Sequence, residues 1–247
     1  RDFCARRSIS GVNSINWARL AIQTVYYFTA AASIRAAGER RTPSFTAPTG
    51  NFGDIFAGYA AKRMGLPADM LCVAVNANDI MHRALTTGRY ERRDVVATIS
   101  PSMDIQVASN FERLLFEASG RSSAGVAALM GDLASHGAYD IPAAWRRSIA
   151  KDFVSAAISE AECEHTIARE FSERGMLVDP HTAVGLAATR KARASGALKG
   201  PVVTLATAHP AKFPDAVENA AGQRPHLPDH VRDLFARPER MVEIDPV

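Results

Sequence analysis

The sequence is short of cysteine, and neither sign of charge dominates it. Its 247 residues include three cysteines (Cys4, Cys72 and Cys163), an odd number without the spacing of a metal site. So few cysteines argue against a disulfide framework and suit a reducing compartment. The formal net charge of +3 is too small to indicate a nucleic-acid partner, and no run of basic residues supports one.

A long uncharged, apolar stretch is also missing. The strongest candidate for a membrane span is the segment 14–38, but Arg19, Gln23 and Arg35 interrupt it, so its uncharged run is too short for a bilayer. The segment instead predicts a long, largely buried helix. We find no signal-peptide pattern either, and we therefore expect a cytoplasmic protein with no membrane contact.

What the sequence does contain is an alternation of strand-like and helix-like segments. Apolar, β-branched runs predict strands over 43–48, 70–78, 95–100 and 200–210. Helical patterns cover 14–37, 54–64, 79–88, 103–119 and 179–196, and residues 122–175 look wholly helical. Such alternation is typical of a parallel sheet covered by helices. We predict an α/β fold with a parallel sheet flanked by helices, as one domain over 1–247 with a mostly helical insertion at about 120–175.

Polar residues and glycines mark several of the predicted helix ends. Ser14, Asp54 and Asn78 stand where the N-caps of three helices are expected. Gly88 stands where the third of these helices should stop. These positions predict where the helices begin and end, and Ser102 and Asp104 are interpreted as turn and cap residues in the same way.

The stretch TGNFGD, residues 49–54, joins a predicted strand directly to a predicted helix. Unpaired backbone N–H groups point outward at a helix start, and the helix dipole favours an anion there. Gly50 and Gly53 let the backbone approach a ligand closely, and Asn51 adds a side-chain donor. The stretch matches neither the dinucleotide fingerprint nor the Walker loop. From these residues alone, phosphate binding and a simple tight turn both stay open.

Six blocks of the sequence, in this order, closely resemble the threonine synthase family, in the branch found in many bacteria and fungi. They run along essentially the whole chain: GVNSINWARLAIQTVYYF, PTGNFGDIFAGYAAKRMGLP, NDIMHRALTTGRYE, SPSMDIQVASNFERLLFE, DPHTAVG and TAHPAKFPDAV. The resemblance implies a pyridoxal phosphate enzyme of the tryptophan synthase β-like group. Such an enzyme converts O-phospho-L-homoserine and water to L-threonine and phosphate.

The resemblance also implies roles for the glycine loop and for the last strand. The loop residues that would grip the cofactor phosphate are Gly50, Asn51, Phe52, Gly53 and Asp54. Thr207 is placed like the hydroxyl residue that hydrogen-bonds the pyridine nitrogen. A neutral hydroxyl there, instead of a carboxylate, leaves the ring nitrogen less protonated and the cofactor a milder electron sink.

Because the implied substrate carries a phosphate of its own, a second anion site is required. Within the resemblance we assign it to Ser14, Asn16 and Arg19, since a helix N-terminus with an arginine suits a phosphate dianion. The alternative is that Ser14 serves only as an N-cap and that Arg19 pairs with an acidic residue.

Other conspicuous residues are interpreted as structural. We expect a capping or packing role for His181. For His209 and Lys212 two roles stay open, one at the border of the pocket and one that is purely structural. The aromatic residues of the first helix are expected in the core: Trp17, Tyr26, Tyr27 and Phe28. No metal ligand set is predicted.

Members of the family need a lysine that holds the cofactor as a Schiff base and moves protons. The family carries this lysine in a Phe-Lys-Asp type motif upstream of the block that begins this resemblance. None of the lysines in the present sequence has that context: Lys62, Lys151, Lys191, Lys199 and Lys212. By resemblance the N-terminal part of the enzyme is therefore absent, and we expect no synthase turnover from this polypeptide alone.

Two further readings stay open. The chain can be a catalytically inactive remnant that binds pyridoxal phosphate or another phosphate. It can also derive from another β-elimination or β-replacement enzyme of the same fold, which is less favoured because the two phosphate sites occur together.

Overall fold

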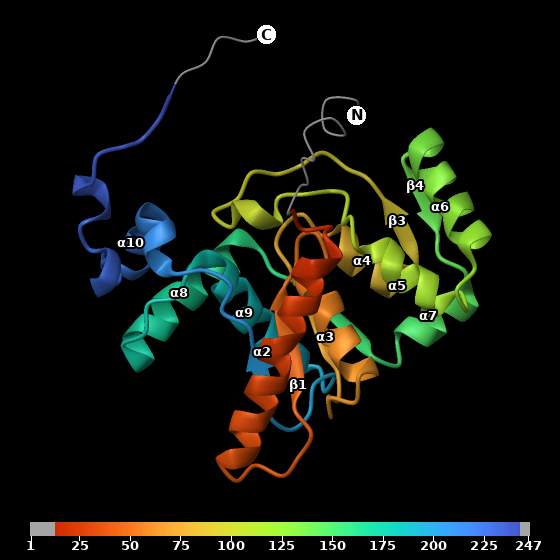
Figure 1. Cartoon of the computed structure of the whole chain (residues 1–247), viewed down its shortest axis with the longest axis horizontal. Helices are drawn as coiled ribbons and strands as arrows, with labels where there is room; N and C mark the ends of the chain where they lie inside the picture. The colour runs from red at the N-terminus through yellow and green to blue at the C-terminus, as the bar shows by residue number, and fades with distance from the viewer. Residues whose placement is uncertain (1–12, 243–247) are drawn as a thin grey trace.

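The computed structural model of the chain describes residues 13–242, so Cys4 lies outside the described part (Figure 1). Its main sheet has four parallel strands in the order β5-β2-β1-β6. The strands are β1 (Ser44–Pro48), β2 (Leu71–Val75), β5 (Phe153–Ala157) and β6 (Val202–Thr204). The predicted α/β class, with a parallel sheet flanked by helices, is confirmed.

Helices cover both faces of this sheet. On one face α3 and α4 pack against the strands and α2 lies on α3; on the other face α9 crosses all four strands and carries α8, which in turn contacts α10. These helices are α2 (Trp17–Ala36), α3 (Gly53–Arg63), α4 (Ile80–Thr87), α8 (Glu160–Arg174), α9 (Pro180–Ala194) and α10 (Pro214–Ala221). All residues of β1 and β2 are buried, as expected of central parallel strands.

A second group of elements lies at one end of the long axis, opposite α10 (Figure 1). It contains α5 (Phe111–Ala118), α6 (Ser123–His136), α7 (Ala143–Ile149) and the antiparallel pair β3 (Arg89–Glu91) and β4 (Ala138–Asp140). Short 3-10 helices complete the described chain: η1 (Pro101–Met103), η2 (Pro210–Lys212), η3 (Asp229–Val231) and η4 (Leu234–Ala236).

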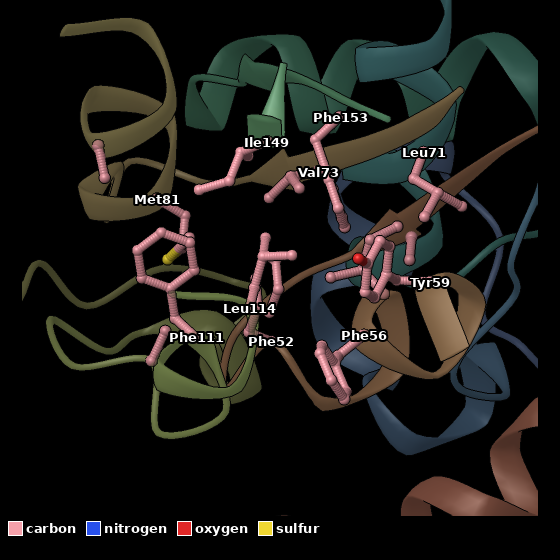
Figure 2. Packing of buried hydrophobic residues seen from close by; sticks show 14 of the residues in the cluster. Phe52, Phe56, Tyr59, Leu71, Val73, Met81, Phe111, Leu114, Ile149 and Phe153 are labelled. Atoms are coloured by element: carbon pink, nitrogen blue, oxygen red, sulfur yellow. The ribbon is translucent and has the colours of Figure 1, made fainter. Parts of the chain in front are cut away.

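The largest apolar cluster lies between the sheet and the α3, α4 and α5 layer (Figure 2). Phe52, at the entrance of α3, points into this cluster. Its ring centroid is 5.2 Å from that of Phe111 and 5.8 Å from that of Phe153 on β5. One side chain therefore ties the loop after β1 to the sheet and to α5.

The order of the strands creates a switch point beside β1. The chain passes from β1 to β2 on one side and returns with β6 on the other side. In open α/β sheets ligands bind where the connections diverge in this way, outside the carboxyl ends of the strands. The loops that follow β1 and β6 both start at this place.

The strand predicted over 95–100 is wrong. No strand forms there, and Val95 and Val96 are 54% and 52% exposed. The backbone amides of the segment donate to side chains instead of to a neighbouring strand: Val96 N to Asn78 Oδ1, Thr98 N to Asp104 Oδ2 and Ile99 N to Glu160 Oε1.

The missing strand of the sheet lies inside the segment that was predicted to be wholly helical. Residues 122–175 contain β4 and β5, and β5 pairs with β2 from Leu71↔Phe153 to Val75↔Ala157. With only five residues, including Ser155, β5 carries little strand signal between two helices. The division of the chain into one domain and an insertion stays a prediction.

Helix α2 is not the largely buried helix that its composition predicts. Only Leu20, Thr24 and Tyr27 are buried, while Ile22 is 72% exposed and Val25 is 57% exposed. Trp17 and Phe28 are exposed as well, which corrects their predicted core position. Within residues 13–242 no helix is long and apolar enough to cross a membrane.

Candidate functional site

The loop between β1 and α3 turns sharply at Phe52. This residue has φ 63° and ψ 3°, a left-handed conformation that is unusual for an aromatic side chain. Its side chain is only 1% exposed, so core packing holds the backbone in this shape. The side chain of Phe52 thus belongs to the core, and its backbone N–H belongs to the loop.

The two glycines of the loop are needed because atoms of other segments approach them closely. A Cβ at Gly50 would lie 2.6 Å from the carbonyl oxygen of Ser102, and a Cβ at Gly53 would lie 3.2 Å from Asn110 Nδ2. Asn110 also donates to the carbonyl of Asn51 at 3.0 Å and to that of Ser14 at 2.9 Å. Neighbouring loops thus hold the glycine loop in place.

The loop presents a continuous row of unused hydrogen-bond donors. Across the described chain, none of the six backbone amides from Gly50 to Ile55 donates to another protein group, whereas the flanking amides do. Thr49 N donates to Ala74 O at 2.8 Å, and Phe56 N donates to Phe52 O at 3.1 Å. A row of amides without acceptors in the described chain, running into the first turn of α3, is typical of an anion site, since the dipole of the helix adds to their partial charges.

Asp54 lies in the first turn of α3, but it does not cap the helix as predicted. The N-cap is Phe52, which makes no side-chain cap bond. The Asp54 carboxylate instead accepts one short hydrogen bond from Tyr26 and a longer one, at 3.3 Å, from Tyr27. Burial raises the pKa of Asp54, and the two phenols and Arg19 oppose that shift. Burial beside this acid likewise raises the pKa of both tyrosines.

One face of α2 runs along the opening beside the glycine loop. Arg19, Gln23 and Tyr26 share this face at helical spacing and line the same cavity as Ser14. Ser14 is not the N-cap of α2, which corrects that prediction. Asn16 is the N-cap, with its Oδ1 accepting from Ala18 N at 2.9 Å, and it is not among the cavity-lining residues of the described chain.

Thr207 follows the end of β6 and lines the same cavity as the glycine loop. Lys212, from η2, lines the cavity too. His209 does not line it among the described residues. Its Nδ1 accepts from Ala211 N at 3.2 Å and caps η2.

His181 supports the floor of the cavity from the start of α9. Its Nε2 accepts from Ser102 N at 3.2 Å, and its Nδ1 lies 2.9 Å from the buried carboxylate of Asp179. Since an amide can only donate, Nε2 carries no proton and Nδ1–H donates to Asp179. His181 is 4% exposed, and this arrangement agrees with the packing role predicted for it and fixes the segment that touches Gly50.

The parts described above surround a single cavity of about 820 Å³. It contains eight of the nine residues predicted for the site: Ser14, Arg19, Gly50, Asn51, Phe52, Gly53, Asp54 and Thr207. Ser102 lies in η1 and Asp104 is the C-cap of that turn, as predicted. The Asp104 carboxylate also accepts hydrogen bonds from Asn76, Asn78 and Thr98. The helix that Asn78 was expected to cap begins at Ile80 without a side-chain cap.

Comparison with known proteins decides the family. The sequence model described as "Threonine synthase, C-terminal" matches residues 182–246. Threonine synthase from Pseudomonas aeruginosa is 50% identical over 97% of this chain and 50% of its own length. The solved structure of pyridoxal phosphate-bound threonine synthase from Brucella melitensis is 51% identical, with a TM-score of 0.90 over 96% of this chain and 50% of that one. The yeast threonine synthase structure is 39% identical, with a TM-score of 0.84 over 91% and 48%.

The chain belongs to the threonine synthase family. It matches a C-terminal portion of those enzymes and spans about half the length of the relatives named above. The resemblance inferred from the six sequence blocks is therefore confirmed.

Two cavity residues of this threonine synthase relative were missed from the sequence. Tyr26 was assigned to the core and Gln23 to no role, yet both line the cavity. The signal was present, because they lie four and seven positions after Arg19 and therefore on the same helix face. No group of histidine, cysteine or acidic side chains in residues 13–242 is arranged to hold a metal ion.

Proposed function

We propose that the cavity between β1, β6 and α2 binds pyridoxal 5′-phosphate, with its phosphate on the amides of residues 50–55. The observation that carries this proposal is the row of six backbone donors at residues 50–55, in the loop and the first turn of α3, which have no acceptor among the described residues. Isolated, unpaired N–H groups are costly in a folded protein unless water or a ligand satisfies them. An anion with several oxygens would satisfy them together.

The rest of the cavity is compatible with this cofactor. Its volume of about 820 Å³ lies in the range of ~300–1,000 Å³ that is usual for small-molecule sites. Thr207 would hold the ring nitrogen at the other end, and its neutral hydroxyl would leave that nitrogen less protonated. When bound, the cofactor supplies an electron sink for carbanion chemistry.

For the substrate we propose O-phospho-L-homoserine, which the parent enzyme would convert with water to L-threonine and phosphate. Arg19 and Ser14 line the cavity at the start of α2 and would bind the substrate phosphate. Arg19 can supply two parallel hydrogen bonds and a permanent charge. Asn16 lies at the helix end outside the lining, so its substrate contact stays a prediction from the sequence.

This chain alone supplies binding groups but no identified lysine for covalent catalysis. Of the lysines in the described chain, Lys212 lines the cavity, and it lies on η2, where its Nζ is 6.0 Å from the Phe213 ring centroid. We therefore infer that the chain by itself binds cofactor without synthase turnover. The second reading, a protein that only binds pyridoxal phosphate or another phosphate, rests on the same lysine inventory.

Isothermal titration of the purified chain tests the binding proposal. Pyridoxine 5′-phosphate is the appropriate probe because it has no aldehyde and cannot react with surface lysines. We expect saturable binding that inorganic phosphate competes for, weaker binding of pyridoxine, and a loss of affinity in Gly50→Ala, whose Cβ would meet Ser102 O at 2.6 Å. Gly131→Ala, where a Cβ meets nothing within 4 Å, is the matched control. Equal affinity for pyridoxine and its phosphate would contradict the proposal.

A further inference from the structure

The proposed anion site contains an acidic side chain that should oppose it. Asp54 lies in the first turn of α3, lines the cavity, and belongs to the same stretch as the six free amides. A carboxylate at this position is attracted to the same N–H groups and the same helix dipole that attract a phosphate. It is also close enough to Arg19 for that guanidinium to lower its pKa against the dominant effect of burial.

Two tyrosine hydroxyls already donate hydrogen bonds to the Asp54 carboxylate. Tyr26 Oη donates to Asp54 Oδ1, and Tyr27 Oη donates to the Asp54 carbonyl at 2.9 Å and to Oδ1 at 3.3 Å. The rings of the two tyrosines stack with centroids 5.2 Å apart. Both phenols come from α2, so the acid is held from the helix that also carries Arg19.

The inner phenol of this pair is fixed by packing. Tyr27 is fully buried and its ring centroid is 5.0 Å from that of Phe45 on β1. Gly58 on α3 makes room for it, since a Cβ there would lie 2.6 Å from the ring. Tyr26 is the outer partner and lines the cavity, so it can be changed with less damage to the core.

We propose that Tyr26 and Tyr27 are positioning residues that hold the Asp54 carboxylate away from the loop amides, so that these donors stay free for a ligand phosphate. The inference rests on the proposed phosphate site. It explains why an acidic residue is tolerated at the entrance of α3: its charge is directed toward α2 and is satisfied there. The tyrosines act through Asp54 and need not touch the ligand.

A double-mutant cycle tests this with inorganic phosphate and pyridoxine 5′-phosphate as probes. Tyr26→Phe releases the acid, which then competes for the donors, and we expect affinity to fall roughly tenfold, the usual worth of a hydrogen bond to a charged group. Asp54→Asn keeps an acceptor for the phenols but has no charge, and should bind at least as tightly as the unchanged chain. The double variant should recover the affinity of Asp54→Asn. Tyr59→Phe, on α3 but outside the cavity lining, is the matched control.

A role in folding alone would give a different pattern. In that case Tyr26→Phe would weaken binding and Asp54→Asn would not restore it, and this outcome would overturn the inference. Unchanged affinity in Tyr26→Phe would overturn it too, while leaving the phosphate site intact. If the unchanged chain binds neither probe, the phosphate site itself is wrong and the inference falls with it.

A second measurement needs no ligand. A released carboxylate should bond the amides of residues 53–55, so hydrogen exchange at these amides should slow in Tyr26→Phe and return to its original rate in the double variant. Exchange rates that stay the same in Tyr26→Phe would contradict the proposed movement of the acid. Circular dichroism of each variant confirms that it is folded.

Discussion

Phe52 joins the core to the candidate site within one residue. Its ring packs between α5 and β5, and its backbone, at φ 63°, turns the chain from the loop into α3, where residues 50–55 line the cavity. A left-handed backbone at a bulky residue costs energy and persists only where surrounding structure enforces it. Here the buried ring provides that enforcement.

Removing this ring should destabilise the whole chain. We expect Phe52→Ala to lower the free energy of unfolding by about 3–5 kcal/mol, as for other buried phenylalanines. Urea denaturation followed by circular dichroism measures it. Phe235→Ala, at a position 86% exposed, should change the free energy by less than about 0.5 kcal/mol. A small effect at Phe52 would show that its ring does not hold the loop.

Asp54 should give the stability of the chain a characteristic pH dependence. Burial raises its pKa in the folded protein, so the folded state holds the proton more tightly than the unfolded chain does. Its contribution is therefore most favourable below the usual aspartate pKa and is lost as pH rises through the raised, folded-state pKa. Asp54→Asn, which has no charge to bury, should be more stable than the unchanged chain at neutral pH.

The difference between the two proteins should shrink toward zero as pH falls, because Asp54 is then protonated in both the folded and the unfolded state. Urea denaturation of both proteins at several pH values measures this difference. A difference that is independent of pH, or that grows in acid, would contradict the assignment of a buried, destabilised carboxylate at this position.

For single residues, the sequence predicts the position of the glycine loop better than the roles of its side chains. Gly50, Gly53 and the helix start were predictable because strand, glycines and helical pattern follow one another directly. The bonds of Asp54 to α2 were not, since they join residues 27 and 28 positions apart. Asn16 and not Ser14 is the N-cap because of backbone angles, and the sequence does not distinguish two polar residues that are only two positions apart.

Helix α2 shows what apolar composition cannot predict. Because small and apolar residues surround most of the helix, its sequence does not identify a buried face. In the structure its buried side is narrow, its cavity side carries Arg19 and Gln23, and Ile22 and Val25 face outward.

This outward face should contribute little to the stability of the chain. We expect Ile22→Gln with Val25→Gln to change the free energy of unfolding by less than about 0.5 kcal/mol, as for other surface substitutions. Leu20→Ala, 1% exposed on the same helix, should cost about 2–5 kcal/mol. Thermal and urea denaturation compare the three proteins. A large loss in the double variant would mean that this face is packed in solution.

Among the strands of the main sheet, β1, β2 and the edge strand β6 were predicted from the sequence, and the edge strand β5 was not. The strands β1 and β2 are continuous apolar runs, whereas β5 is five residues between helices, and the apolar segment 95–100 bonds to side chains instead of to a strand. Local pattern identifies a segment that is buried on both sides. It does not identify which of two short segments pairs with β2.

At the level of the whole molecule, the order of the strands determines where the site forms. The return of the chain beside β1 brings Thr207, after β6, to the cavity that the glycine loop lines, although 154 to 157 residues separate them along the chain (207 − 53 and 207 − 50). Physical pattern alone did not reveal this proximity, and the resemblance to threonine synthases supplied it.

The chain spans about half the length of its relatives, and we expect it to lack their catalytic activity on its own. We expect no release of phosphate from O-phospho-L-homoserine by the chain with pyridoxal phosphate, because no lysine in the expected motif is present. Phosphate release and threonine formation are measured in parallel, with full-length threonine synthase from Pseudomonas aeruginosa as positive control. Sustained threonine formation by the chain alone would show that one of its own lysines serves catalysis.

The amide signals of the glycine loop provide the most direct test of the central claim. A titration of the isotope-labelled chain with pyridoxine 5′-phosphate, followed by nuclear magnetic resonance, reports each backbone N–H separately. The account predicts saturable shifts at the amides of residues 50–55 and at Thr207, with inorganic phosphate reproducing only the loop shifts. Shifts confined to other parts of the chain, or none at residues 50–55 at saturation, would contradict it.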